Sequence, residues 1–127
     1  MRSHTNFRLK SKVPREDYEQ IVAATWLEKN KILFYHIPNG GKRSLTEAIK
    51  FKRMGVKSGI PDICIPLARK GHHGLYIELK RVSGGTVSES QRFWMARLSE
   101  QGYDVFIAHG AQELINYVKN YLGETHE

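Results

Sequence analysis

The stretch that most constrains this chain runs from Gly59 to Lys80. It opens with Gly-Ile-Pro-Asp at residues 59–62 and closes with Ile-Glu-Leu-Lys at residues 77–80, and apolar and polar residues alternate in both flanks. This alternation predicts two strands, because successive side chains on a strand point to opposite faces of the sheet. The loop at residues 68–74 contains two glycines, which favours a β-hairpin.

A hairpin of this kind would gather polar side chains on one face of the sheet. Antiparallel pairing predicts that Asp62 lies near Glu78, that Lys80 shares their face, and that Leu79 points into the core. Two carboxylates about 4 Å apart repel by roughly 4 kcal/mol at an effective dielectric of 20, which favours a shared proton or a cation between them. Mg²⁺ prefers such oxygen ligands and promotes phosphodiester hydrolysis.

The neighbouring ammonium of Lys80 would orient a water or contact a phosphate. The alternative is an ordinary surface strand with a Glu-x-Lys pair, a pattern that is common by itself. Pro-Asp followed by Glu-x-Lys on two facing strands is more specific, and it favours a metal site over a surface strand.

A first helix is expected from Pro14 to about Lys29, with acidic residues in its first turn. Glu19 heads the apolar stripe of this helix, since residues 22, 23 and 26 follow it at helical spacing. Two interpretations of Glu19 stay open on spacing alone. It is either a favourable early acidic residue or a third carboxylate directed at the metal.

The charge balance points to a polyanionic partner. The 127 residues carry a formal charge of +7, which favours nucleic acid, and the length fits one domain. No apolar run approaches membrane-spanning length, and residues 1–12 lack the apolar core expected of a signal peptide. The single cysteine, Cys64, lies within an expected strand and is best explained as a small buried hydrophobe, so we expect a reducing, cytoplasmic setting.

Basic residues are densest between residues 42 and 57, immediately before the Gly-Ile-Pro-Asp stretch. A capping box at residues 44–47 predicts a short helix from Leu45 to about Met54 within this segment. A solvated charged helix is the ordinary explanation, but the scarcity of acidic residues here favours a surface for DNA phosphates. The expected DNA-binding residues are Lys42, Arg43, Lys50, Lys52, Arg53, Lys57, Arg69, Lys70, Arg81 and Arg92.

The remaining elements follow from periodicity and turn signals. Strands are expected at residues 31–37 and 103–108, the second parallel to the strand that carries Glu78, and a last helix at residues 112–122. His36 is expected to be a hydrogen-bonded structural residue. The adjacent pair His72 and His73 is not expected to bind metal, because neighbouring side chains point apart.

Another helix is expected from Ser88 to about Gln101, opened by a capping box of Ser88 and Gln91. Gln91 is either the partner of that cap or a polar contact to the site, and the sequence leaves both open. The expected buried stripe of this helix is Phe93, Trp94, Met95, Ala96 and Leu98.

Together these residues resemble the PD-(D/E)xK nuclease superfamily, with Pro61-Asp62 and Glu78-Leu79-Lys80 as the motif. More narrowly the chain is similar to the VRR-NUC family over roughly residues 16–122. Leu79 stands where the family name gives Val, and both residues are apolar.

The resemblance implies a restriction-endonuclease-like α/β fold, a mixed central sheet flanked by helices, in a nuclease domain at residues 13–123. Residues 1–12 are polar and basic without periodicity, so we expect them to form a flexible basic arm before this domain. It implies Mg²⁺- or Mn²⁺-dependent cleavage of branched DNA, such as Holliday junctions, by a homodimer. Carried over by position, Asp62, Glu78 and Glu19 are metal ligands, Lys80 is the catalytic lysine, and Gln91 matches a site position.

Three alternatives accompany this interpretation. One is a catalytically silent DNA-binding module on the same fold, against which the intact motif argues. Another is a sequence-specific restriction endonuclease, for which a recognition domain or long loops would be expected. The last is an RNA-binding protein, which would need aromatic platforms at recognisable spacing.

Overall fold

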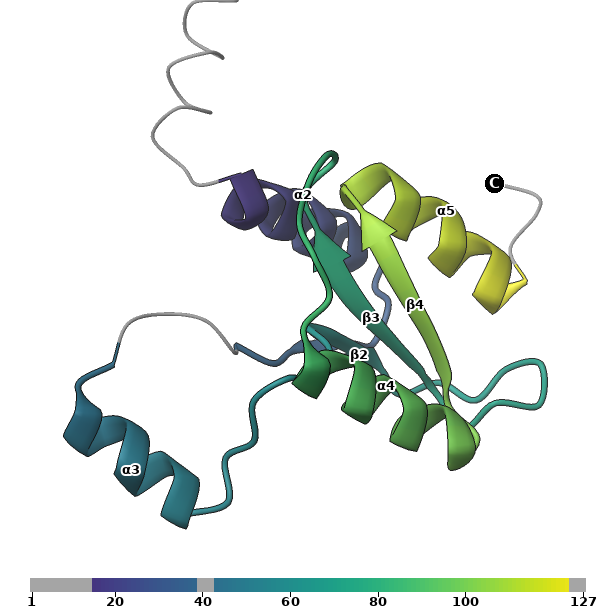
Figure 1. Cartoon of the computed structure of the whole chain (residues 1–127). Helices are drawn as coiled ribbons and strands as arrows, with labels where there is room; N and C mark the ends of the chain where they lie inside the picture. Colours follow the sequence, from purple (N-terminus) through teal and green to yellow (C-terminus); the bar gives the residue numbers. More distant parts are fainter. Residues whose placement is uncertain (1–14, 39–42, 124–127) are drawn as a thin grey trace, which may run out of the picture.

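The computed structural model describes residues 15–38 and 43–123, which form a four-stranded mixed sheet with helices on both faces (Figure 1). The strands are β1 (Tyr35–His36), β2 (Ile63–Ile65), β3 (Leu75–Lys80) and β4 (Asp104–His109), in the order β1-β2-β3-β4. The helices are α2 (Arg15–Lys29), α3 (Leu45–Arg53), α4 (Glu89–Glu100) and α5 (Ala111–Leu122). The order and the α/β class are those predicted, while residues 1–12 and Lys42 lie outside the described residues.

The core lies between the sheet and the pair of helices α2 and α5. Alternate residues of β3 point to this side, because a strand turns every second side chain to the same face. They pack with the apolar stripes of the two helices, which lie against one another. The fully buried members of this cluster include Ala23, Leu27, Ile63, Ile65, Leu75, Ile77, Leu114 and Val118.

The hairpin has the register that the sequence predicted. Ile63 pairs with Ile77 and Ile65 with Leu75, and the same antiparallel register places Asp62 opposite Glu78. Leu79 joins the core, also as predicted. Cys64 is buried within β2, which confirms that it acts as a small hydrophobe.

Strand β1 is shorter than the predicted strand at residues 31–37. It consists of Tyr35 and His36 only, which pair with Cys64 and Ile63 of β2. His36 is a hydrogen-bonded structural residue, as predicted: its Nδ1 lies 2.8 Å from the carbonyl oxygen of Asp62. The amide of Ile37 donates to the same carbonyl at 2.6 Å, so β1 holds the backbone at Asp62 in place.

Helix α4 covers the other face of the sheet, but with a different stripe from the one predicted. Gln91, Trp94, Met95 and Leu98 are half-buried, at the spacing of one helical face, whereas Phe93 is 54% exposed and Ala96 is exposed. The prediction was wrong for Phe93 and Ala96 because it began the stripe at the first apolar residue. The stripe begins with the polar Gln91, which therefore faces the sheet.

Helix α3 stands away from the sheet (Figure 1). Its capping box is formed as predicted, with Ser44 Oγ accepting from the Glu47 amide at 3.1 Å, and none of its residues is buried. Leu45, for example, is 77% exposed. None of the helices that the structure describes combines the length and the apolar character needed to cross a lipid bilayer.

Candidate active site

The face of β3 turned toward α4 carries Tyr76, Glu78 and Lys80. Glu78 is 3% exposed and Lys80 is 8% exposed, and these two are the buried charged residues of the described part of the chain. Removing an ion from water costs several kcal/mol of free energy, so burial of this pair is not explained by a gain in folding stability. Burial raises the pKa of the Tyr76 hydroxyl well above its usual value, so Tyr76 stays neutral on this face at physiological pH.

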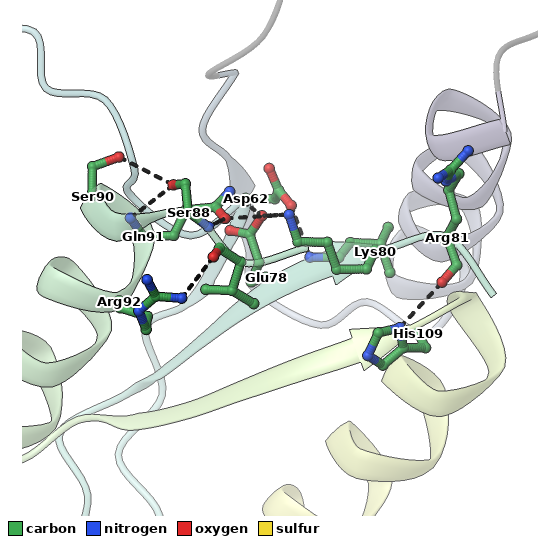
Figure 2. A network of polar contacts seen from close by, with 11 residues as sticks. Asp62, Glu78, Lys80, Arg81, Ser88, Ser90, Gln91, Arg92 and His109 are labelled. Atoms are coloured by element: carbon green, nitrogen blue, oxygen red, sulfur yellow. Dashed lines mark hydrogen bonds and ion pairs between the residues drawn. The ribbon is translucent and has the colours of Figure 1, made fainter. Parts of the chain in front are cut away.

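Asp62 directly precedes the first residue of β2 and lies across from this pair (Figure 2). Its Oδ2 accepts a hydrogen bond of 2.8 Å from the backbone amide of Leu79, the residue between Glu78 and Lys80. Asp62 is half-buried, so the group also borders solvent, where a substrate would approach. The structure thus brings Asp62, Glu78 and Lys80 together on one side of the hairpin, as the alternation predicted.

Gln91 links the two charged side chains of β3. Its Nε2 donates to Glu78 Oε2 at 2.8 Å, and its Oε1 accepts from Lys80 Nζ at 3.3 Å. Lys80 Nζ also lies 3.4 Å from Glu78 Oε2. The three side chains form a closed triangle in which each polar end has its position set by the other two (Figure 2).

Gln91 also completes the capping box of α4, whose N-cap is Ser88. Its Oε1 accepts from the Ser88 amide at 2.8 Å, and Ser88 Oγ accepts from the Gln91 amide at 3.1 Å. Both interpretations of Gln91 therefore hold in the structure. The sequence contained a signal for this, because residues 91, 94, 95 and 98 share one helical face, but Gln91 was not placed on it in the prediction.

Gly59 explains why the Gly-Ile-Pro-Asp stretch begins with glycine. Its φ is +91°, a region that disfavours side chains, and a Cβ there would lie 2.6 Å from the backbone carbon of Ser90. The loop before Asp62 therefore runs directly against the first turn of α4. This contact sets the separation between the two elements that carry Asp62 and Gln91.

The donor set of the site suits a hard divalent cation. It offers carboxylate oxygens from Asp62 and Glu78 on neighbouring strands, and oxygen ligands are those that Mg²⁺ and Mn²⁺ prefer. In this structure the ammonium of Lys80 and the amide of Gln91 provide the positive charge and the donor that face Glu78. A cation between the carboxylates of Asp62 and Glu78 would add further positive charge beside these acidic oxygens.

Glu19 contacts the start of α5 in this structure, and its role at a metal stays a prediction. Its Oε1 accepts a hydrogen bond of 2.7 Å from the amide of Ala111, at the start of α5. Gly110 precedes that helix and has no side chain to cap it, so Glu19 serves as the cap from a distant part of the chain. Within the described residues, no three His, Cys, Asp or Glu side chains are gathered closely enough to hold a metal in this conformation.

The cap predicts a stability effect for Glu19. Glu19→Ala is expected to lower the free energy of unfolding by about 1 kcal/mol, because the first turn of α5 loses its acceptor. Glu19→Gln retains an oxygen acceptor and is expected to lose less. Urea denaturation of both variants measures the difference, and equal stability of Glu19→Ala and the unchanged protein would contradict the cap.

The predicted DNA-binding residues fall into separate regions. Arg43, Lys52 and Lys57 line a cleft that reaches the first turn of α4, where Arg92 also lies and donates to the Val87 carbonyl. Lys50 and Arg53 line a different groove on α3. Arg81 follows β3 directly, whereas Arg69 and Lys70 occupy the hairpin turn at the opposite end of β3 from Glu78 and Lys80. The structure thus separates this last pair from the site.

His72 and His73 lie in the same hairpin loop. His73 packs edge-on against Tyr103, with ring centroids 5.8 Å apart, and its amide donates to the Gly102 carbonyl. His72 lies 6.4 Å from the ring of Tyr121. The two rings therefore turn toward different aromatic neighbours.

The mixed sheet and this site define a class of protein. Pro61-Asp62 leads into β2 and Glu78-Leu79-Lys80 ends the adjacent antiparallel strand β3, with their polar side chains on one face, which is the arrangement of the PD-(D/E)xK superfamily. A model of the VRR-NUC domain family matches residues 13–112. The chain belongs to the VRR-NUC family.

A solved structure described as a VRR_NUC domain protein is similar to this chain. It has a TM-score of 0.76 and 32% sequence identity, and the match covers 87% of this chain and 89% of that one. No curated protein matches the chain significantly. Membership of the family implies a nuclease-type function with DNA as the substrate.

Proposed function

We propose that this protein is a divalent-metal-dependent endodeoxyribonuclease that selects branched DNA, such as Holliday junctions. The observation that carries the proposal is the convergence of Asp62, Glu78, Lys80 and Gln91 from β2, β3 and α4. A buried acid–lysine pair beside a second carboxylate costs stability, and hydrolysis of a phosphodiester is a chemistry that would retain it.

Each residue has a distinct task in this proposal. Asp62 and Glu78 would hold the metal, and Glu19 would join them as a further carboxylate if it exchanged its bond to Ala111 for the metal. A bound Mg²⁺ or Mn²⁺ supplies Lewis-acid charge neutralisation and lowers the pKa of a water. Lys80 orients the attacking water or pairs with a phosphate oxygen, and Gln91 holds Glu78 and Lys80 in their working positions.

Basic side chains near the site would offset the repulsion between acidic ligands and a polyanion. The candidates in the cleft beside the site are Arg43, Lys52 and Lys57. The candidates on the elements that carry the site are Arg81, directly after β3, and Arg92 in α4. The formal charge of +7 acts in the same direction. We assign the nuclease domain to residues 13–123, with residues 1–12 as a basic arm and the cytoplasm as the setting.

A substrate panel tests the proposed function. Labelled Holliday junction, flap and linear duplex of the same sequence are incubated with the protein and Mg²⁺, with Mn²⁺, or with EDTA. We expect cleavage of the branched substrates well above that of the linear duplex, and none in EDTA. Discrete fragments from plasmid DNA would instead indicate a sequence-specific restriction enzyme, and binding without cleavage a silent DNA-binding module.

We also propose that the protein acts as a homodimer. A two-fold pair would present two sites, and paired incisions across a symmetric junction need two. Several large apolar side chains of the described residues are available for such an interface, among them Ile21 at 56% exposure and Leu33 at 60%. Sedimentation equilibrium is expected to give twice the mass of the 127-residue chain, and a monomer at micromolar concentration would contradict the proposal.

A further inference from the structure

A cleft between the α3 segment and the first turns of α4 lies beside the site, and the hydrolytic residues do not use it. Its volume is about 430 Å³, within the roughly 300–1,000 Å³ common for small-molecule sites. It is lined from two distant parts of the chain, residues 43–58 and α4. The lining residues are Arg43, Ala48, Phe51, Lys52, Val56, Lys57, Ser58, Ser90 and Trp94.

Two aromatic side chains belong to this lining. Phe51 comes from α3 and Trp94 from α4, and both are half-buried, so each leaves part of its ring exposed. The guanidinium carbon of Arg43 lies 4.7 Å from the centroid of the Phe51 ring. Aromatic rings and guanidinium planes are the surfaces on which unstacked nucleobases rest.

The charge of the lining is of one sign. Arg43, Lys52 and Lys57 are cationic, no acidic residue is among the lining residues that the structure describes, and Ser58 and Ser90 add hydroxyl groups. A ligand that satisfies this set has a flat π surface, polar edges and negative charge. A nucleotide has all three, because its base stacks, its edges form hydrogen bonds and its phosphate pairs with cations.

The position of the cleft relates it to the site. Ser90 precedes Gln91, which binds Glu78, and Ser58 precedes the loop that leads to Asp62. At Gly59 that loop contacts Ser90, which lines the cleft. The cleft and the site are therefore adjacent. An occupant of the cleft would therefore sit next to the DNA backbone held at the site.

We infer that this cleft binds a single unstacked nucleotide of the DNA substrate, the one displaced where a branch opens the duplex. The inference rests on the proposed function, and it names a physical basis for the preference for branched DNA. A fully paired duplex keeps its bases stacked, so filling the cleft would cost the free energy of unstacking a base. A branch point offers an unpaired base at lower cost.

The test measures binding in EDTA, where no hydrolysis takes place. The probe is a duplex with a short single-stranded tail that carries 2-aminopurine at the junction, compared with the same duplex without a tail. We expect tighter binding of the tailed DNA and a quenched 2-aminopurine signal. Phe51→Ala is expected to weaken binding of the tailed DNA by about tenfold and to leave the blunt duplex unchanged.

Leu45→Ala is the matched control, because Leu45 is apolar, exposed on the same helix and outside the cleft lining. It should change neither affinity. An abasic nucleotide in place of 2-aminopurine should weaken binding as Phe51→Ala does. Equal affinity for tailed and blunt DNA, or an equal loss for both with Phe51→Ala, would overturn the inference even if cleavage is normal. A protein that binds the tail but never cleaves would overturn the proposed function instead.

Discussion

Asp62→Asn and Glu78→Gln are each expected to reduce cleavage at least about a thousandfold, which corresponds to about 4 kcal/mol of activation free energy. Both changes retain the size of the side chain and remove the negative charge that would hold a metal. Glu78→Gln still presents an oxygen to Gln91 Nε2 but leaves Lys80 buried without its carboxylate partner, so urea denaturation of this variant accompanies the kinetics. Single-turnover cleavage of a labelled junction in Mg²⁺ measures the loss.

DNA binding in EDTA should stay the same or become tighter in these variants. Removing a carboxylate lessens the repulsion of a polyanion, and the basic residues on α3 and α4 are untouched. Glu100→Gln is the matched control: Glu100 is exposed on α4 and pairs with Arg97, away from the site. Cleavage at the unchanged rate by either Asp62→Asn or Glu78→Gln would show that these carboxylates do not hold the metal.

Lys80→Met is expected to reduce turnover about a hundredfold or more with little change in KM, because the ammonium acts on the reacting groups rather than on the DNA backbone. The same change leaves Glu78 buried without its cationic neighbour, which should lower the free energy of unfolding by about 3 kcal/mol. Rapid-quench kinetics and urea denaturation give the two quantities. Lys29→Met, at the exposed end of α2, is the control for loss of a lysine.

Mg²⁺ separates the two effects of Lys80→Met. If Asp62 and Glu78 hold the metal, Mg²⁺ should stabilise Lys80→Met more than the unchanged protein, because the cation replaces the missing positive charge beside Glu78. Thermal unfolding with and without Mg²⁺ measures this. Turnover at the normal rate would contradict a catalytic role for Lys80, and an equal Mg²⁺ effect on both proteins would contradict the metal site.

Local sequence patterns were sufficient to predict the hairpin and the starts of two helices. The alternation at residues 62–67 and 75–80 predicted the hairpin, and its register followed, because a slip of one residue would turn every apolar side chain out of the core. The capping boxes at Ser44 and Ser88 located the starts of α3 and α4. The capping boxes depend on residues three positions apart, and the hairpin on two segments joined by a short loop. Both features are therefore local in the sequence.

Patterns failed where the outcome depended on a distant partner. The strand expected at residues 31–37 pairs with β2 only at Tyr35 and His36. Phe93 is exposed because Gln91, not an apolar residue, begins the stripe of α4 that faces the sheet. For Glu19 the pattern left two interpretations open, and its hydrogen bond comes from the amide of Ala111, 92 residues away. No spacing within the first helix distinguishes a carboxylate that caps another helix from one that faces a metal.

The sequence by itself determined which residues lie on the polar face of the hairpin, since the two-residue period of a strand assigns Asp62, Glu78 and Lys80 to one side. Only the tertiary structure decided what that face meets. Glu78 and Lys80 are buried there with Gln91 of α4 between them, and Gly59 allows the loop before Asp62 to touch the first turn of that helix. Packing between elements far apart in the chain turned a polar strand face into a site.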